Sequence, residues 1–273
     1  MKNNASIAMI CLDFDGTIMR YDPTEHFHPD VILALNALEQ AGLEWVAHSG
    51  RTYESQRDII THCMEAHGLR HRPSAICHHE CFIHVREGSV YMPLDAWNQQ
   101  ALRWLAELDA LVQQPAMREA LDALVRAHHP EVYRRDNVTV FHLPGPDENR
   151  LPFVQELNAL LERIPHAATI CNGEWITIND KRLGKGNVLK AYLAYRELSP
   201  ACVLAAGDHE NDLSMLDGSV TPHVACPGNA YATVRDAVTR AGGYVATAHG
   251  PEGTLEAFQH FLPGLVAPPA INS

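Results

Sequence analysis

The stretch IAMICLDFDGTI, residues 7–18, decides which fold the chain is expected to adopt. Its apolar first half predicts a buried strand, and two carboxylates, Asp13 and Asp15, follow at the end of that strand. Because residues i and i+2 of an extended chain point to the same face, both carboxylates are expected to enter one small volume. Burying two like charges so close together is costly unless another group offsets their repulsion. The sequence therefore predicts a compensating group at this strand end.

The composition is that of an ordinary globular chain, long enough for one large domain or two smaller ones. Of its 273 residues, 46% are hydrophobic and 20% are charged, and the formal net charge is -12. This acidic balance argues against a nucleic-acid-binding protein and against docking on an anionic membrane. An anionic ligand would have to be held by a few local cations or by a metal.

The cellular compartment is suggested by three features. The apolar part of residues 1–16 is too short, and too soon followed by acidic residues, for a signal peptide. No apolar run approaches the roughly 20 residues that a membrane span needs. The seven cysteines are scattered and odd in number, which favours reduced thiols. We therefore expect a cytoplasmic protein, whose oligomeric state the sequence does not indicate.

Apolar strands alternate with helical patterns at both ends of the chain, which predicts an α/β fold with a parallel sheet covered on both faces. Residues 28–42 predict a helix with Pro29 in its first turn and Gly42 just past its end. The middle of the chain differs, because it combines helices with hairpins through Glu87-Gly88 and Asn172-Gly173. This content predicts an inserted α+β domain.

Four polar stretches follow the right kinds of element to share one site at the carboxyl edge of the sheet. They are Asp13 to Thr17, Ser49-Gly50-Arg51, Lys185 between two glycines, and Asp208 with Asn211 and Asp212 close behind. The sequences DFDGT, HSGRT, LGKGNVLKAYL and GDHENDLSML resemble the four motifs of the haloacid dehalogenase-like phosphatase superfamily.

The long insertion between the second and third motifs resembles the subgroup with a type C2B cap, which includes sucrose-phosphate phosphatases, Cof-type sugar phosphatases and phosphomannomutases. The resemblance implies a Rossmann-like core formed by residues 1–84 and 180–273. It also implies a cap of residues 85–179 that closes over the site and selects the leaving group.

The resemblance further implies a role for each motif residue. Asp13 would attack phosphorus and form an aspartyl-phosphate, Asp15 would act as general acid and base, and Lys185 would supply positive charge. Lys181, Arg182 and Lys190 compete for the lysine role, but Gly-Lys-Gly at a helix start favours Lys185. Mg²⁺ is the expected cofactor, since hard oxygen ligands suit it. Its expected ligands are Asp13, Asp208, Asp212 and the backbone carbonyl of Asp15, and the expected substrate contacts are Thr17, Ser49, Gly50 and Asn211.

One stretch departs from the family pattern. His79-Glu80-Cys81 stands where many relatives have Asn-Gly-Ala-like residues bordering the site. The surrounding CHHEC sequence lacks the spacing of a zinc site, so a structural or pocket-wall role is favoured.

These features together predict a Mg²⁺-dependent phosphatase acting on a small phosphorylated metabolite, most readily a sugar phosphate. A phosphosugar mutase of the same fold and a receiver-like protein that is merely phosphorylated on aspartate are the alternatives.

Overall fold

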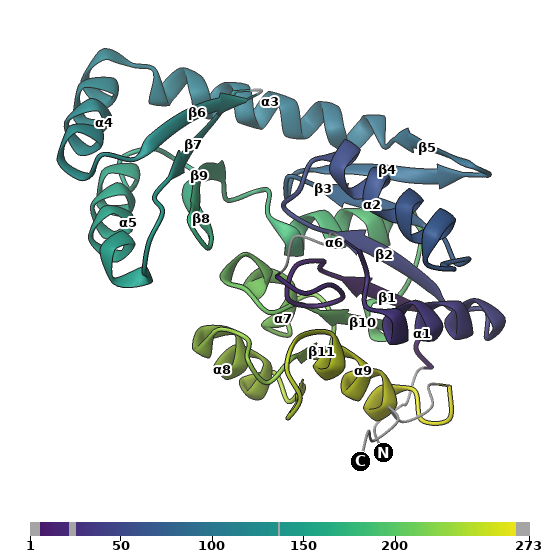
Figure 1. Cartoon of the computed structure of the whole chain (residues 1–273). Helices are drawn as coiled ribbons and strands as arrows, with labels where there is room; N and C mark the ends of the chain where they lie inside the picture. Colours follow the sequence, from purple (N-terminus) through teal and green to yellow (C-terminus); the bar gives the residue numbers. More distant parts are fainter. Residues whose placement is uncertain (1–5, 22–25, 136, 266–273) are drawn as a thin grey trace. The chain divides into compact units, whose positions relative to one another are not determined.

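The structure is a computed structural model that describes residues 6–21, 26–135 and 137–265. The chain divides into two compact units (Figure 1). The first consists of Met1–Leu94 with Lys185–Ser273 and is called the core here, and the second, Asp95–Gly184, is called the insertion. The predicted α/β class with an inserted α+β unit is confirmed.

The core is built on one sheet of eight strands in the order β12-β11-β10-β1-β2-β3-β4-β5. Strands β12 to β3 of this order run parallel, and β4 and β5 are antiparallel additions at one edge. The strands are β1 (Met9–Leu12), β2 (Glu44–His48), β3 (Ala75–His78), β4 (Phe82–Glu87), β5 (Val90–Pro93), β10 (Val203–Ala206), β11 (His223–Cys226) and β12 (Tyr244–Val245).

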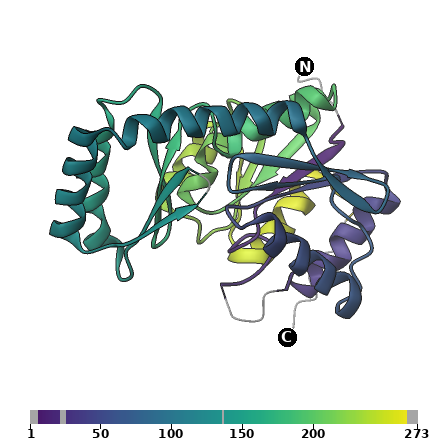
Figure 2. The same ribbon diagram turned by 90° about the horizontal axis from the view of Figure 1, so that it is seen from above.

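Helices connect these strands and cover both faces of the sheet. Ile10 and Leu12 join a hydrophobic cluster with residues of α1, α2 and α9, whereas Met9 and Cys11 are buried on the opposite face. Figure 2 shows α6 (green) and α1 (purple) on opposite sides of the sheet. The helices of the core are α1 (Pro29–Gln40), α2 (Tyr53–Ala66), α6 (Lys185–Tyr195), α7 (Leu213–Leu216), α8 (Ala232–Arg240) and α9 (Gly250–Phe261), with single 3-10 turns η1 (Pro200–Cys202) and η2 (Glu210–Asp212).

The register of the central strands positions the site. Leu12 of β1 lies level with Ala47 of β2 on one side and with Ala206 of β10 on the other. All three strands are parallel, so the polar residues that follow them emerge at the same edge of the sheet. Asp13 therefore leaves the sheet between the segments that carry Ser49 and Asp208.

The insertion is a four-stranded antiparallel sheet of order β6-β7-β9-β8 with helices packed on one face. Phe141, Ile176 and Ile178 of the sheet share a hydrophobic cluster with leucines of α4 and α5, such as Leu124 and Leu157. Its elements are α3 (Asp95–Val112), α4 (Pro115–His128), β6 (Glu131–Arg135), β7 (Val138–His142), α5 (Asp147–Leu161), β8 (Ala167–Asn172) and β9 (Trp175–Asp180).

The hairpin β4–β5 lies elsewhere than the sequence suggested. The sequence predicts that the inserted domain begins at residue 85, within this hairpin. In the structure β4 pairs with β3, with Ala75 level with Val85, so the hairpin extends the core sheet. The insertion accordingly begins at Asp95 and ends at Gly184. Among the described residues, no helix combines the length and the apolar composition that crossing a membrane requires.

Candidate active site

The loop after β1 turns back sharply and places Asp13 at the strand end. The N–H of Gly16 donates to the carbonyl of Met19, 2.9 Å away, and Phe14 is fully buried beneath the turn. Gly16 has a φ of +75°, in the left-handed region that favours glycine. A Cβ at this position would also collide with the Asp208 carboxylate. The Asp-Gly pair is therefore required by both the turn and the neighbouring strand.

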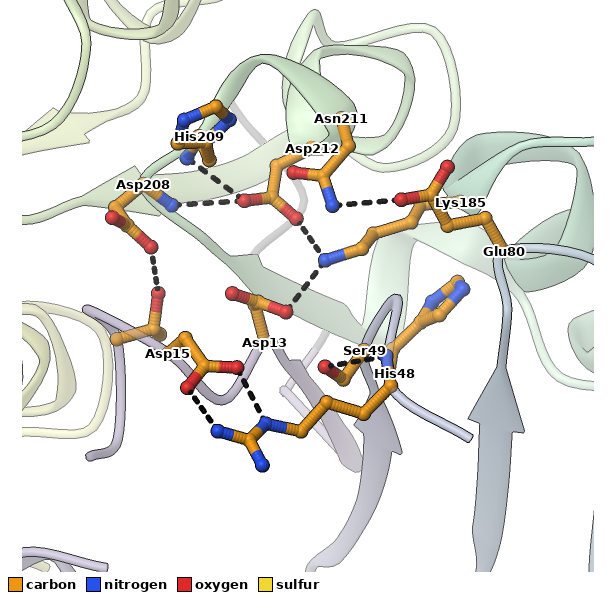
Figure 3. A network of polar contacts seen from close by, with 12 residues as sticks. Asp13, Asp15, His48, Ser49, Glu80, Lys185, Asp208, His209, Asn211 and Asp212 are labelled. Carbon is orange, nitrogen blue, oxygen red and sulfur yellow. Dashed lines mark hydrogen bonds and ion pairs between the residues drawn. The ribbon is translucent and has the colours of Figure 1, made fainter. Parts of the chain in front are cut away.

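Lys185 joins two of the predicted carboxylates. It is the first residue of α6, its side chain is fully buried, and its Nζ donates to Asp13 Oδ1 at 2.6 Å and to Asp212 Oδ1 at 2.5 Å. Figure 3 shows this ammonium group between the two carboxylates. The other lysine-role candidates lie elsewhere, since Lys190 is exposed on α6 and Arg182 pairs with Asp180 within the insertion.

Asp212 and Asp208 are fixed by further hydrogen bonds. Asp212 Oδ2 accepts from the backbone N–H groups of Asp208 and His209, each at 3.0 Å, which ties η2 to the end of β10. Asp208 accepts from the Thr17 hydroxyl through Oδ1 and from the Tyr21 hydroxyl through Oδ2, each at 2.9 Å. The predicted residue Thr17 thus orients a carboxylate in this structure.

Burial makes the ionised form of these carboxylates unfavourable. It raises the pKa of Asp13 well above its usual range, and neighbouring carboxylates add to this rise whereas Lys185 opposes it. Burial likewise raises the pKa of Asp208 to about 7, with the charge of Asp212 adding to it. For Lys185, burial alone would lower the pKa, but Asp13 and Asp212 outweigh it and raise the pKa. The lysine stays charged, yet it does not neutralise the carboxylates around it.

The donor set fits a divalent cation. Each of Asp13, Asp208 and Asp212 offers a carboxylate oxygen, and these oxygens lie within 4.8 Å of one another at buried positions. Hard carboxylate oxygens are the ligands that Mg²⁺ prefers. The raised pKa values of Asp13 and Asp208 mark the negative charge that such an ion would offset. The side chain of the fourth predicted ligand, Asp15, lies outside this group.

Asp15 instead forms an ion pair with Arg51. Arg51 Nε donates to Asp15 Oδ2 and the terminal nitrogen NH2 donates to Oδ1, both at 2.8 Å, in the bidentate geometry typical of arginine. Both side chains are about three-quarters buried. Ser49, after β2, accepts from the backbone N–H of Arg51 at 3.3 Å, and the half-buried Gly50 lies between them.

Comparisons with known proteins relate this chain to one family of hydrolases. A family model described as haloacid dehalogenase-like hydrolase matches residues 121–245, and no curated protein matches the sequence. A sucrose-phosphatase from Synechocystis, solved with sucrose and phosphate, is 17% identical with a TM-score of 0.68, and the match covers 94% of this chain and 98% of that chain. Residues 121–245 are thus similar to the haloacid dehalogenase-like hydrolases, and the chain shares the fold of this sucrose-phosphatase.

Two further solved structures share the fold of this chain. A protein from Thermoplasma acidophilum is 16% identical with a TM-score of 0.63, and the match covers 94% of this chain and 98% of that chain. A subclass IIB sugar phosphatase of the same superfamily is 16% identical with a TM-score of 0.62, and the match covers 93% of this chain and 98% of that chain. The predicted fold is confirmed, and the match to a hydrolase family model supports the predicted superfamily and the assignment as an enzyme.

The sequence assigns no specific contact to three residues of the candidate site. Tyr21 carries no signal in the sequence, since its role depends on how the loop folds back. Arg51 belongs to the polar stretch after β2, but the sequence does not indicate that it pairs with Asp15. Glu80 lies in the stretch that departs from the family pattern, and its carboxylate accepts from the Asn211 side-chain amide at 2.8 Å.

Proposed function

We propose that this hydrolase cleaves phosphomonoesters of small metabolites, sugar phosphates in particular, with Mg²⁺ as cofactor. One observation carries the proposal. The buried Lys185 donates to the carboxylates of Asp13 and Asp212. A third carboxylate, Asp208, lies close enough for all three to hold one metal ion, at the carboxyl end of parallel strands. Phosphoryl transfer requires charge neutralisation and positioning above all, and this arrangement provides both.

Asp13 is the proposed nucleophile. Lys185 holds its Oδ1, so Oδ2 is the atom that we expect to attack phosphorus. A bond then forms between Oδ2 and phosphorus while the ester P–O bond breaks, and the leaving oxygen takes a proton from Asp15. In the second step water attacks the aspartyl-phosphate, Asp15 takes the proton of that water, and phosphate is released.

Asp13, Asp208 and Asp212 would hold Mg²⁺, with the backbone carbonyl of Asp15 as the further ligand that the family resemblance implies. The ion would neutralise charge on the phosphoryl oxygens and position them. The ion pair between Arg51 and Asp15 adds a requirement. Because Arg51 engages both oxygens of Asp15, the pair has to loosen before Asp15 exchanges a proton with the leaving group.

The sucrose-phosphatase and the sugar phosphatase with the same fold support sugar phosphates as the first substrates to test. The thiol state of the cysteines is consistent with the cytoplasm as the proposed compartment. We also propose that Ser49 and Gly50 line the position of the phosphoryl group and that Asn211 contacts the substrate.

The test is phosphate release from a panel of phosphorylated sugars and other metabolites, with Mg²⁺ and with chelator. We expect many turnovers per chain with Mg²⁺ and none with chelator. The matched control is Asp13→Asn, which preserves the shape of the side chain and removes the nucleophile. The proposal fails if the folded wild-type chain releases no phosphate from any ester in the presence of Mg²⁺, or if Asp13→Asn is as active as the wild type.

A further inference from the structure

The turn between β3 and β4 is strained at two positions. His79 and Glu80 have φ values of +50° and +59°, and the N–H of Cys81 closes the turn on the carbonyl of His78 at 3.0 Å. Two consecutive left-handed residues form the tight turn that Asn-Gly fits best. A glutamate in this conformation is uncommon and is retained only where its surroundings determine it.

Burial adds a second cost at the same residue. Glu80 is 6% exposed, and burial raises the pKa of its carboxyl to about 7, although Lys185 and the hydrogen bond from Asn211 both oppose the rise. Neither the backbone nor the solvation of this position favours glutamate. Strain and an ionisable group that coincide beside an active site point to a role in the site.

The contact that Glu80 makes identifies this role. Asn211 Nδ2 donates to Glu80 Oε1 at 2.8 Å, and Asn211 precedes Asp212, the carboxylate that holds Lys185. Asn211 is 8% exposed, and its Oδ1 is buried without a hydrogen-bond partner in the described part of the chain. Figure 3 shows the amide of Asn211 facing the Glu80 carboxylate, alongside Lys185.

We propose that Glu80 is a positioning residue that holds the Asn211 amide in one orientation and so presents Asn211 Oδ1 as an acceptor to a hydroxyl or water in the site. Glu80 accepts hydrogen bonds and does not donate them when ionised, so the nitrogen of the amide must face it and the oxygen must face away. Without this partner, the amide is free to rotate by half a turn and exchange its donor and acceptor. This inference rests on the proposed phosphatase function.

The experiment compares two glycine substitutions in the same turn. Glu80→Gly and His79→Gly both relieve a left-handed residue, but only the first removes the carboxylate. With para-nitrophenyl phosphate and Mg²⁺, we expect His79→Gly to keep the wild-type kcat and Glu80→Gly to lose on the order of tenfold to a hundredfold in kcat, as misplacement in a site does. The melting temperature of Glu80→Gly should equal that of the wild type although its kcat falls. This result would exclude a folding defect as the cause.

Two further variants test the route through Asn211. Glu80→Gln offers Asn211 an oxygen but also a donor NH2 group, so it fixes the orientation only in part. Its kcat should lie between those of the wild type and Glu80→Gly. In a double-mutant cycle, adding Glu80→Gly to Asn211→Ala should cost nothing more, because Glu80 then has no amide to orient. Losses that multiply, a Glu80→Gln variant as slow as Glu80→Gly, or equal kcat in the two glycine variants would each overturn the inference.

A readout independent of turnover separates this inference from the proposed function. The side-chain amide resonances of Asn211, assigned by their loss in Asn211→Ala, should shift in Glu80→Gly and stay in place in His79→Gly. An unshifted amide in Glu80→Gly overturns the inference while the phosphatase proposal stands. A wild-type chain without turnover on any ester overturns the proposed function, and the catalytic consequence of the Glu80 contact with it.

Discussion

The replacement of Lys185 by methionine tests whether this cation stabilises the buried carboxylates of the site. The side chain of Lys185 is 0% exposed, and its Nζ lies 2.6 Å from Asp13 Oδ1 and 2.5 Å from Asp212 Oδ1. Lys185→Met therefore leaves two buried carboxylates without their cation. Breaking a buried ion pair in this way costs about 3–5 kcal/mol. A chain of this size loses about 2–4 °C in melting temperature per kcal/mol, so we expect a fall of roughly 6–20 °C. Methionine has nearly the same length as lysine, so packing contributes little.

The matched control is Lys190→Met, the same change at an exposed position of α6. A surface substitution of this kind changes stability by about 0.5 kcal/mol at most. Melting curves are recorded for both variants at pH 5 and pH 8, with Mg²⁺ and with chelator. Mg²⁺ should recover part of the loss in Lys185→Met, because it binds the folded chain at the same carboxylates.

The pH dependence sharpens the Lys185 test. Burial raises the pKa of Asp13 in the folded chain, and the loss of Lys185 removes the charge that opposes this rise. At pH 5 the carboxyl then takes up a proton, and the missing cation costs less than at pH 8. The reasoning is refuted if Lys185→Met melts within a degree or two of Lys190→Met, or if its loss is the same at both pH values.

Three further predictions follow from the contacts of the same site. The pKa of Asp208 is about 7 in the folded chain and near 3.8 when unfolded, so the folded chain binds more protons between these values. With chelator present, the free energy of unfolding should therefore fall as the pH rises from about 4 to about 7, and saturating Mg²⁺ should reverse this trend in urea titrations. Thr17→Val removes the hydrogen bond to the Asp208 carboxylate and should cost about 1.5–3 kcal/mol in urea titrations at pH 8, and less at pH 5. Gly186→Ala would push a Cβ into the carbonyl of Ser214, so it should cost about 1–3 kcal/mol in melting experiments and lower kcat by displacing the first turn of α6.

The fold was predictable because local patterns and the global arrangement agree. The strand before Asp13 is uniformly apolar, and the helix of α1 carries Pro29 at its start and Gly42, at a φ of +73°, past its end. The predicted hairpin forms between β8 and β9, but its turn is shifted by one residue. Asn172 pairs with Trp175 as the last residue of β8, and Gly173, at a φ of +56°, begins the turn. Parallel strands bring their ends to one edge, so the positions of Asp13, Ser49 and Asp208 relative to one another follow from topology.

The features that the sequence did not predict depend on contacts between residues that are far apart in the chain. The hairpin β4–β5 has the same local pattern whether it joins the core or the insertion, and only its pairing with β3 decides. The sequence does not predict strand β6, Glu131–Arg135. It is an edge strand with charged residues and lacks a clear apolar alternation. The partners of Arg51 and Glu80 are 36 and 131 residues away in the chain, at distances for which a single sequence carries no pairing signal.

The charges of the site explain why the proposed metal ion and the strained turn belong together. The ammonium group of Lys185 faces several carboxylates, namely Asp13, Asp208, Asp212 and Glu80. The guanidinium of Arg51 is engaged by Asp15. A phosphate ester brings further negative charge into this region, so binding it is unfavourable until a divalent cation offsets the carboxylates. Metal binding would therefore be a condition for substrate binding as well as for chemistry. The same excess of negative charge makes a neutral asparagine, held in place from behind by Glu80, better suited than another cation-binding carboxylate to contact a hydroxyl or water in the site.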